Sequence, residues 1–403
     1  MKTSSALLLA SAVGGTFAAP ASTKAGITFS ATTTHTGKVR NALDDLAYAF
    51  NKYVPAEKQA AILASLPKRD TGSVATKAEP NPAGYDKLYL TEVSIGNPPQ
   101  KLNLDFDTGS SDLWVFSTDT GSSYTGGQTL YKPKSSSSSS LINGESWAIH
   151  YGDGSQCSGV IYSDDVTIGG LTVKGQAVES AQKVSSQFTK DSQSSGLLGL
   201  AYSKGNTAKP TQQKTWFDNI SSKLDKNLFT VRLRHGAEGS FNFGYIDSAQ
   251  YTGDISYAAA YTDDLGHRLF NSDGYAVGNG ETKSASMSAT ADTGTSLLII
   301  PDEIADDYWS NVQSANKVQT QGGNLWVFNC SDSLPDFSFN VGSGKAVVPG
   351  DNMNYAAQGD GTCVGGISSH PGLDITIVGD VAMKSALVIY DDANNQLGWA
   401  TGA

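Results

Sequence analysis

Two short motifs of the same design carry the clearest chemical signal in this sequence. Residues 106–111, Phe-Asp-Thr-Gly-Ser-Ser, return as residues 291–296, Ala-Asp-Thr-Gly-Thr-Ser. Each motif is followed later by two apolar residues and a glycine, at 197–199 in the first case and at 377–379 in the second. A repeat of this kind indicates two homologous halves, and each half would give one aspartate, Asp107 or Asp292, to a shared centre.

A pair of aspartates at one centre can hydrolyse a peptide bond with water. The reaction needs a base that activates the water and an acid that protonates the carbonyl oxygen. Two neighbouring carboxyl groups cannot both ionise easily, so at acid pH they share one proton and divide the two roles. The other motif residues would shape the loops, cross-link them and hold the carboxylates: Thr108, Gly109, Ser110, Thr293, Gly294 and Thr295.

Four alternatives explain less of the sequence. A single Asp-Thr-Gly also occurs in Asx turns and at helix caps, but these would not produce a repeat with a matched downstream element. Residues 361–365, Gly-Thr-Cys-Val-Gly, have the outline of a nucleophile elbow, but no alternation of strand and helix surrounds them. A glycosidase also uses two carboxylates, though not in twin loops. A binding protein that kept the fold and lost catalysis would typically lack one of the aspartates.

The composition favours an all-β protein without nucleic-acid or metal chemistry. The chain has 403 residues, of which 43 are glycine, and only 17% of its residues are charged. Its net charge of −11 opposes binding to phosphate backbones and to anionic membranes. The five histidines are scattered, with no spacing typical of metal ligands, so we expect neither a metal nor another cofactor.

The first 69 residues differ from the rest of the chain. Residues 1–18 contain a lysine, a short apolar run and small residues, which is typical of a secretory signal and too short to span a bilayer. Residues 19–69 contain seven Lys or Arg against three acids, and they end in Lys68-Arg69, a dibasic pair typical of processing sites. We therefore expect a basic propeptide that docks on an acidic body, and a secreted mature chain.

From about residue 85 apolar residues alternate with polar ones, as they do in half-buried strands. Residues 89–95 and 102–106 show this period of two, with a Gly-Asn-Pro-Pro turn between them. The same pattern recurs to the end of the sequence. Together with the repeat, it predicts an N-terminal lobe over 70–250 and a C-terminal lobe over 251–403, each with one Asp-Thr-Gly motif.

Three cysteines and two sequons bear on a secreted chain. Cys330 and Cys363 are the natural disulfide pair in an oxidising compartment, which leaves Cys157 as a buried or half-buried thiol. Asn219 and Asn329 each begin an Asn-x-Ser tripeptide, so both are candidate glycosylation sites.

Several longer blocks resemble the pepsin-like aspartic proteases, and within them the secreted fungal type. The blocks lie at residues 104–116, 151–155, 171–181, 196–201 and 377–380, and the likeness extends over essentially all of 70–403. The resemblance implies a bilobal all-β fold, with two β-barrel-like lobes and a central cleft. It also implies a monomeric endopeptidase, made as a zymogen, that cleaves proteins and peptides between hydrophobic residues at acid pH and binds pepstatin-type inhibitors. The Cys330–Cys363 pair matches the single C-terminal-lobe disulfide of that group.

The resemblance also assigns roles to residues outside the two motifs. Tyr151, Gly152 and Asp153 match the flap, a hairpin that closes over the substrate, and Trp114 would hold the Tyr151 hydroxyl with its indole N–H. Asp153 lies where fungal members accept a lysine next to the cleaved bond. Lys52, followed by a tyrosine, resembles the element with which prosegments of the family block the cleft, so we expect its ammonium between the two aspartates.

Two departures from the family pattern stand out. Fungal relatives usually carry Gly-Phe-Trp where this chain has Gly266-His267-Arg268, in a region that borders the primed side of the cleft. Two basic residues in place of two aromatic ones predict an added preference for acidic residues on that side. Thr290, two residues before the second aspartate, replaces a common isoleucine.

Overall fold

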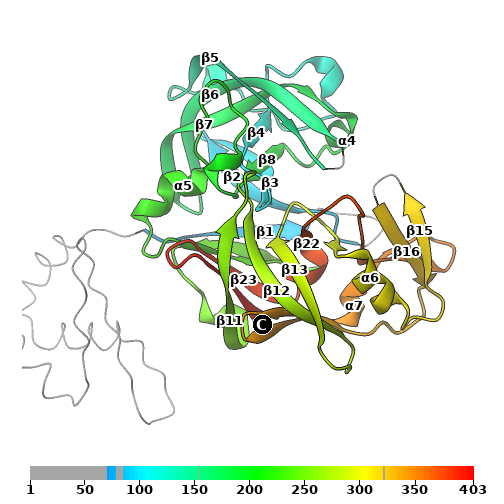
Figure 1. The fold of residues 1–403 in the computed structure, drawn as a ribbon. Coiled ribbons are helices and arrows are strands. Elements are labelled where there is room, and N and C mark those ends of the chain that lie inside the picture. Colours follow the sequence, from blue (N-terminus) through cyan, green and yellow to red (C-terminus); the bar gives the residue numbers. More distant parts are fainter. Residues whose placement is uncertain (1–69, 79–84, 153, 321–322) are drawn as a thin grey trace, which may run out of the picture. The chain divides into compact units, whose positions relative to one another are not determined.

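The computed structural model describes residues 70–78, 85–152, 154–320 and 323–403. The structure is 51% strand and 12% helix, so the prediction of an all-β protein is confirmed. The expected signal and propeptide, with Lys52, Lys68 and Arg69, lie outside the described residues, as does Asp153. In Figure 1 the cyan and blue-green strands form an upper group, and most of the other strands, coloured yellow-green to red, form a lower one.

The first group of strands contains the first Asp-Thr-Gly motif. Its first hairpin follows the predicted alternation, because every second residue of β2 is buried and β2 pairs antiparallel with β3 across the predicted turn. A second hairpin, β5 with β6, continues into β7 by antiparallel pairing. The strands are β1 Gly72–Ala78, β2 Tyr89–Ile95, β3 Gln100–Asp107, β4 Leu113–Phe116, β5 Ser140–His150, β6 Gln156–Ile168, β7 Leu171–Val184, β8 Gly196–Gly199, β9 Leu228–Arg232 and β10 Gly239–Phe243.

The second group repeats this plan around the second motif. Here β12 pairs antiparallel with β13 and with β17, while β15, β16, β19 and β20 form a small separate sheet. The strands are β11 Tyr251–Thr262, β12 Arg268–Val277, β13 Lys283–Ala291, β14 Leu298–Ile299, β15 Asn316–Thr320, β16 Gly323–Asn329, β17 Phe337–Val341, β18 Gly344–Val348, β19 Asn354–Ala357, β20 Thr362–Gly365, β21 Ile367–Ser368, β22 Thr376–Val378, β23 Ala386–Asp391 and β24 Gln396–Gly402.

One sheet contains strands from both groups. Its hydrogen-bonded order is β2-β1-β10-β9-β23-β24-β11, and all of these pairings are antiparallel. The two groups meet where β9 pairs with β23, in the register Val231 with Val388 and Phe229 with Tyr390. The two halves therefore share a ladder of backbone hydrogen bonds.

The helices are short and lie between the strands. The longest, α6, follows a proline, has two acidic residues in its first turn and buries one apolar face. The helices are α4 Ser186–Thr189, α5 Trp216–Ile220, α6 Asp302–Trp309, α7 Gly350–Met353 and α8 Asp380–Met383, with 3-10 turns η2 Ser122–Tyr124, η3 Pro133–Ser135, η4 Ser203–Gly205, η5 Ser221–Lys223 and η6 Ser248–Gln250. Among the residues that the structure describes, no helix is long and apolar enough to cross a membrane.

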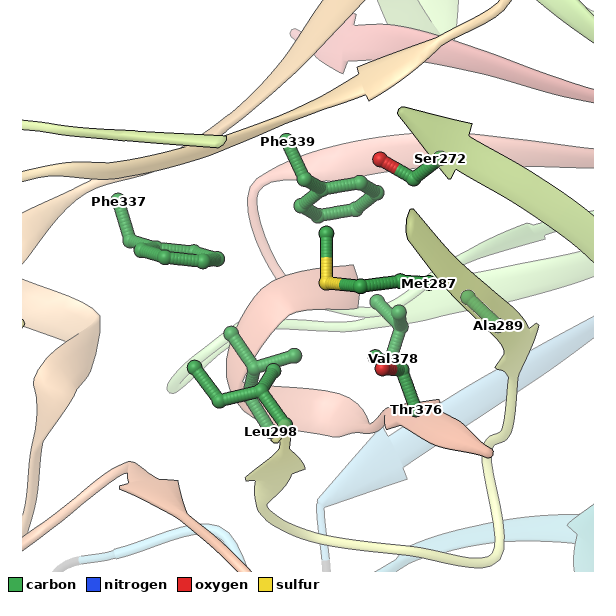
Figure 2. A pocket seen from close by; sticks show the side chains of 9 residues that line it. Ser272, Met287, Ala289, Leu298, Phe337, Phe339, Thr376 and Val378 are labelled. Carbon is green, nitrogen blue, oxygen red and sulfur yellow. The ribbon is translucent and has the colours of Figure 1, made fainter. Parts of the chain in front are cut away.

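A small cavity lies within the core of the second half. It is bounded by apolar side chains and two small polar ones, and Figure 2 shows the Met287 side chain among them with the Phe337 and Phe339 rings nearby. No charged side chain is among its lining residues, and neither motif aspartate reaches it. The cavity is therefore part of the packed core and not a site for catalysis. Its lining residues are Ser272, Met287, Ala289, Leu298, Ile300, Phe337, Phe339, Thr376 and Val378.

Candidate active site

Each motif aspartate lies at the end of a strand, or directly after it, and that strand pairs with the predicted downstream element. Strand β3 ends at Asp107 and pairs parallel with β8, so that Asp107 lies opposite Gly199. Strand β13 ends at Ala291 and pairs parallel with β22, and the Asp292 N–H donates to the Val378 carbonyl at 3.0 Å. The repeat in the sequence thus corresponds to a repeated pair of parallel strands, with one aspartate at the end of each.

The glycine that ends each downstream element leaves space for the motif loop. A Cβ placed on Gly199 would lie 2.6 Å from the Ser110 carbonyl oxygen, which is shorter than any normal contact. The Thr295 carbonyl oxygen approaches Gly379 in the same way, closer still. Any other residue at these positions would push the motif loop away from the neighbouring strand, which explains why both copies end in glycine.

The two motif loops are cross-linked by their threonines. The Thr108 hydroxyl donates to the Ala291 carbonyl at 2.9 Å and accepts the Thr293 N–H at 3.1 Å. The Thr293 hydroxyl donates to the Phe106 carbonyl and accepts the Thr108 N–H at 3.1 Å. This lattice of hydrogen bonds has the symmetry of the sequence repeat, and it fixes one loop against the other.

Each carboxylate is held by its own loop in the same way. The Gly109 N–H donates to Asp107 Oδ1 at 2.7 Å, and the Ser110 hydroxyl donates to Asp107 Oδ2 at 2.5 Å. In the other loop the Gly294 N–H and the Thr295 hydroxyl donate to the two oxygens of Asp292, at 2.9 and 2.6 Å. Ser110 and Thr295 thus each donate to the aspartate of their own loop.

The two carboxyl groups lie against each other at the point where the loops meet. A Cβ on Gly109 would lie 2.6 Å from Asp292 Oδ1, and one on Gly294 would lie 2.5 Å from Asp107 Cγ, so only glycine permits this approach. Asp107 is 5% exposed and Asp292 is 8% exposed. Burial, followed by the charge of Asp292 and a hydrogen bond with it, raises the pKa of Asp107 well above its ordinary value. The pair can therefore retain one proton.

A hairpin next to the pair carries the expected flap tyrosine. Strands β5 and β6 pair up to His150 and Gln156, and the Tyr151 N–H donates to the Ser155 carbonyl across the tip. The Trp114 indole N–H donates to the Tyr151 hydroxyl at 2.8 Å. Burial and the charge of Asp107 raise the pKa of Tyr151, so this hydroxyl stays protonated. Gly152 is exposed at the tip of the hairpin.

The structure corrects the expectation for Arg268. Its side chain is 3% exposed on the relative scale, and its guanidinium binds Asp392 through two nitrogens at 3.0 and 2.8 Å. It also lies 4.0 Å from the centre of the Tyr202 ring. A buried and paired charge cannot select acidic substrate residues, because it is already neutralised. The neighbouring His267 is only partly exposed and pairs with Asp263 at 2.6 Å.

Sequence analysis missed a buried pair of acids near the first motif. Asp112 and Glu179 are 0% and 1% exposed, and the Asn206 amide donates to both, at 3.0 and 2.9 Å. Burial, the charge of Asp112 and a hydrogen bond with it raise the pKa of Glu179 well above its ordinary value. Thr290, the other departure from the family pattern, is buried in β13, and its hydroxyl has no hydrogen-bond partner among the described residues.

The remaining candidate residues are the three cysteines and the two sequon asparagines. Cys330 and Cys363 form a disulfide, as predicted, and Cys157 is a buried thiol. Asn329 is exposed, whereas the half-buried Asn219 donates its side-chain N–H to Gln176 at 2.8 Å. No group of metal-ligating side chains is present in the part of the chain that the structure describes.

The chain is similar to several known proteins. The family model for eukaryotic aspartyl proteases matches residues 88–402. Endothiapepsin of Cryphonectria parasitica is 50% identical over 339 residues, which is 83% of this chain and 80% of that protein. Aspergillopepsin-1 of Aspergillus pseudoglaucus is 46% identical over 370 residues, or 91% and 90%, and aspergillopepsin-1 of Aspergillus oryzae (strain ATCC 42149 / RIB 40) is 47% identical over 352 residues, or 87% and 83%.

Proposed function

This chain belongs to the eukaryotic aspartyl protease family and is an aspartic endopeptidase, and we propose that Asp107 and Asp292 are its catalytic pair. The observation that supports this most strongly is the mutual approach of the two carboxyl groups, which only Gly109 and Gly294 permit. A proton shared between paired carboxyl groups is the established pattern for aspartic proteases. The raised pKa of Asp107 agrees with such sharing.

In the proposed reaction, the ionised member of the pair takes a proton from a water molecule placed between the carboxyl groups. The water oxygen attacks the peptide carbonyl while the protonated member donates to the carbonyl oxygen. As the tetrahedral intermediate collapses, one carboxyl group gives its proton to the leaving nitrogen and the other takes the proton of an intermediate hydroxyl, so the pair is again singly protonated. Ser110 and Thr295 hold the oxygens of their own aspartates throughout, so the carboxyl groups keep their orientation.

The proposal extends to acid pH and to hydrophobic substrates. The shared proton is lost as the pH rises through the raised pKa of Asp107, so activity falls toward neutral pH. The enzyme would cleave peptide bonds between hydrophobic residues. Tyr151, beside Asp107, would close over these substrates and over pepstatin-type inhibitors, with the Trp114 N–H holding its hydroxyl. Asp153 would accept a lysine next to the cleaved bond.

We further propose a monomeric, secreted enzyme made as a zymogen. A basic prosegment would place Lys52 between the ionised aspartates at neutral pH, and acid would weaken that ion pair and permit cleavage after Arg69. The disulfide and the exposed Asn329 are compatible with an oxidising, glycosylating compartment.

The test is to express the full chain with Asp107→Asn or Asp292→Asn and to measure cleavage of a denatured protein between about pH 3 and pH 7. Each change should lower kcat by on the order of 10²–10⁴-fold or more, because one carboxyl group cannot serve as both acid and base. Asp302→Asn in α6 is the matched control and should keep full activity. Substantial activity in either motif variant would contradict the assignment, and sequencing of the secreted N-terminus tests the zymogen directly.

A further inference from the structure

We propose that Tyr390 is a positioning residue for the catalytic pair, whose hydroxyl holds the loop of Asp292 at the carbonyl where Thr108 links that loop to the loop of Asp107. The inference rests on the proposed catalytic role of Asp107 and Asp292. Tyr390 lies far from both motifs in the sequence, in β23 of the sheet that joins the two halves.

The Tyr390 hydroxyl lies inside the lattice of the two loops. It donates to the Ala291 carbonyl at 2.9 Å and lies 3.2 Å from the Thr108 hydroxyl. Ala291 directly precedes Asp292, and Thr108 directly follows Asp107, so one hydroxyl contacts the backbone of one loop and the side chain of the other. Tyr390 is 1% exposed, and burial raises its pKa, so the hydroxyl remains a donor at every pH at which the pair works.

This contact breaks the symmetry of the lattice. Tyr390 pairs in register with Phe229 of β9, and the two rings stack with centroids 4.4 Å apart and planes 9° apart. Phe229 carries no hydroxyl, so the first half of the molecule offers no equivalent donor from this position. The Ala291 carbonyl thus receives a tyrosine hydroxyl in addition to that of Thr108. The loop of Asp292 therefore receives a hydrogen bond from Tyr390, whereas the loop of Asp107 receives none from the equivalent Phe229.

A buried ion pair lies just beyond the end of the strand that carries Tyr390. Asp392, two residues after Tyr390, binds the Arg268 guanidinium, which lies 5.4 Å from the centre of the Phe229 ring. The same guanidinium donates to the Leu200 carbonyl. The Leu200 N–H in turn donates to the Asp107 carbonyl at 2.7 Å. Arg268, one of the two departures from the family pattern, therefore anchors the end of β23 against the first motif.

The contact matters because catalysis depends on the relative placement of two groups on separate loops. A small displacement of one carboxyl group alters the shared proton and the position of the attacking water. Such a change slows the chemical step, while substrate binding along the rest of the site is unaffected. Loss of the Tyr390 hydroxyl should therefore lower kcat and leave KM unchanged.

The experiment compares Tyr390→Phe with a matched loss of a buried hydroxyl elsewhere. Tyr308 in α6 is 0% exposed, and its hydroxyl donates to the Pro335 carbonyl at 2.8 Å, without contact to either motif. Both variants keep the aromatic ring, so both should fold. We expect Tyr390→Phe to lower kcat about three- to tenfold, the equivalent of one net hydrogen bond, with KM unchanged. Tyr308→Phe should retain the wild-type kcat, although its unfolding temperature should fall about as much as that of Tyr390→Phe.

Steady-state kinetics with one synthetic peptide, well below both unfolding temperatures, separate the outcomes. An unchanged kcat in Tyr390→Phe, an equal loss in Tyr308→Phe, or a rise in KM alone would overturn the positioning role. Failure of the proposed function looks different, because wild-type protein would then cleave nothing or Asp292→Asn would remain active. The Tyr390 result is interpreted only against an active wild type assayed in parallel.

Discussion

The buried acid pair of Asp112 and Glu179 should make stability depend steeply on pH. Glu179 Oε2 and Asp112 Oδ2 accept no hydrogen bond from any other group among the described residues. The buried pair is therefore stable only when it keeps a proton between its two carboxyl groups. Replacing the glutamate by glutamine, Glu179→Gln, supplies a permanent N–H of nearly the same shape and removes the titrating group.

The sign and size follow from proton linkage. The folded-state pKa of Glu179 is raised by burial, by the charge of Asp112 and by their hydrogen bond, while the unfolded chain has the ordinary value of about 4.3. The stability that the bound proton contributes is fully present below the unfolded pKa and is lost as the pH rises through the folded pKa. Each pH unit between the unfolded and the folded pKa costs about 1.4 kcal/mol for one proton.

Urea unfolding followed by tryptophan fluorescence, at pH values between about 4.5 and 6.5, measures this slope. All proteins carry Asp292→Asn so that self-digestion does not interfere. With rising pH, the free energy of unfolding of Glu179→Gln should fall by about 1.4 kcal/mol per pH unit less than that of its parent. Glu92→Gln is the control, because Glu92 is exposed and paired with Lys101, and its slope should equal that of the parent. Equal slopes in all three proteins would refute the shared proton.

Two further predictions concern links within the fold. Arg268→Lys keeps the charge but loses the contact of two nitrogens with Asp392, so it should lower the free energy of unfolding by roughly 2–3 kcal/mol. The control, Lys204→Arg in an exposed ion pair, should change it by less than about 0.5 kcal/mol. Equal effects of the two changes would contradict the importance of the buried geometry. Replacing Cys330 and Cys363 together by serine opens a link across 33 residues and should cost about 3–4 kcal/mol in urea unfolding; an unchanged midpoint would show that the link contributes nothing.

The sequence predicted those parts of the site that are encoded locally. The Asp-Thr-Gly motifs, the paired downstream glycines and the alternation of β2 and β3 each depend on residues within a few positions of one another. The contacts that sequence analysis missed join distant segments and leave no periodic signal. Glu179 meets Asp112 through the parallel pairing of β4 with β7, and Tyr390 reaches the motif loops only because β23 lies beside β9.

Arg268 illustrates the limit of arguments from residue type. A basic residue near a binding region is ordinarily a surface charge, so its type predicted contact with substrate. The deciding fact is the position of Asp392. It lies beside Arg268 only in the folded chain, where β11 pairs with both β12 and β24. Burial of a charge depends on such a partner, and nothing in the sequence near residue 268 indicates it.

The sheet that joins the two halves gives the molecule the geometry of a dimer made from one chain. Strands β9 and β23 pair antiparallel across the join, and Phe229 and Tyr390 face each other there, as equivalent residues do across the twofold axis of a symmetric pair of subunits. Separated at this ladder, either half would expose a long unpaired strand edge with buried apolar residues, Leu228–Arg232 on one side and Ala386–Asp391 on the other. Covalent connection keeps the two edges at a fixed, high effective concentration, and it also frees each half to diverge at one residue while its mate stays unchanged, which a true homodimer cannot do.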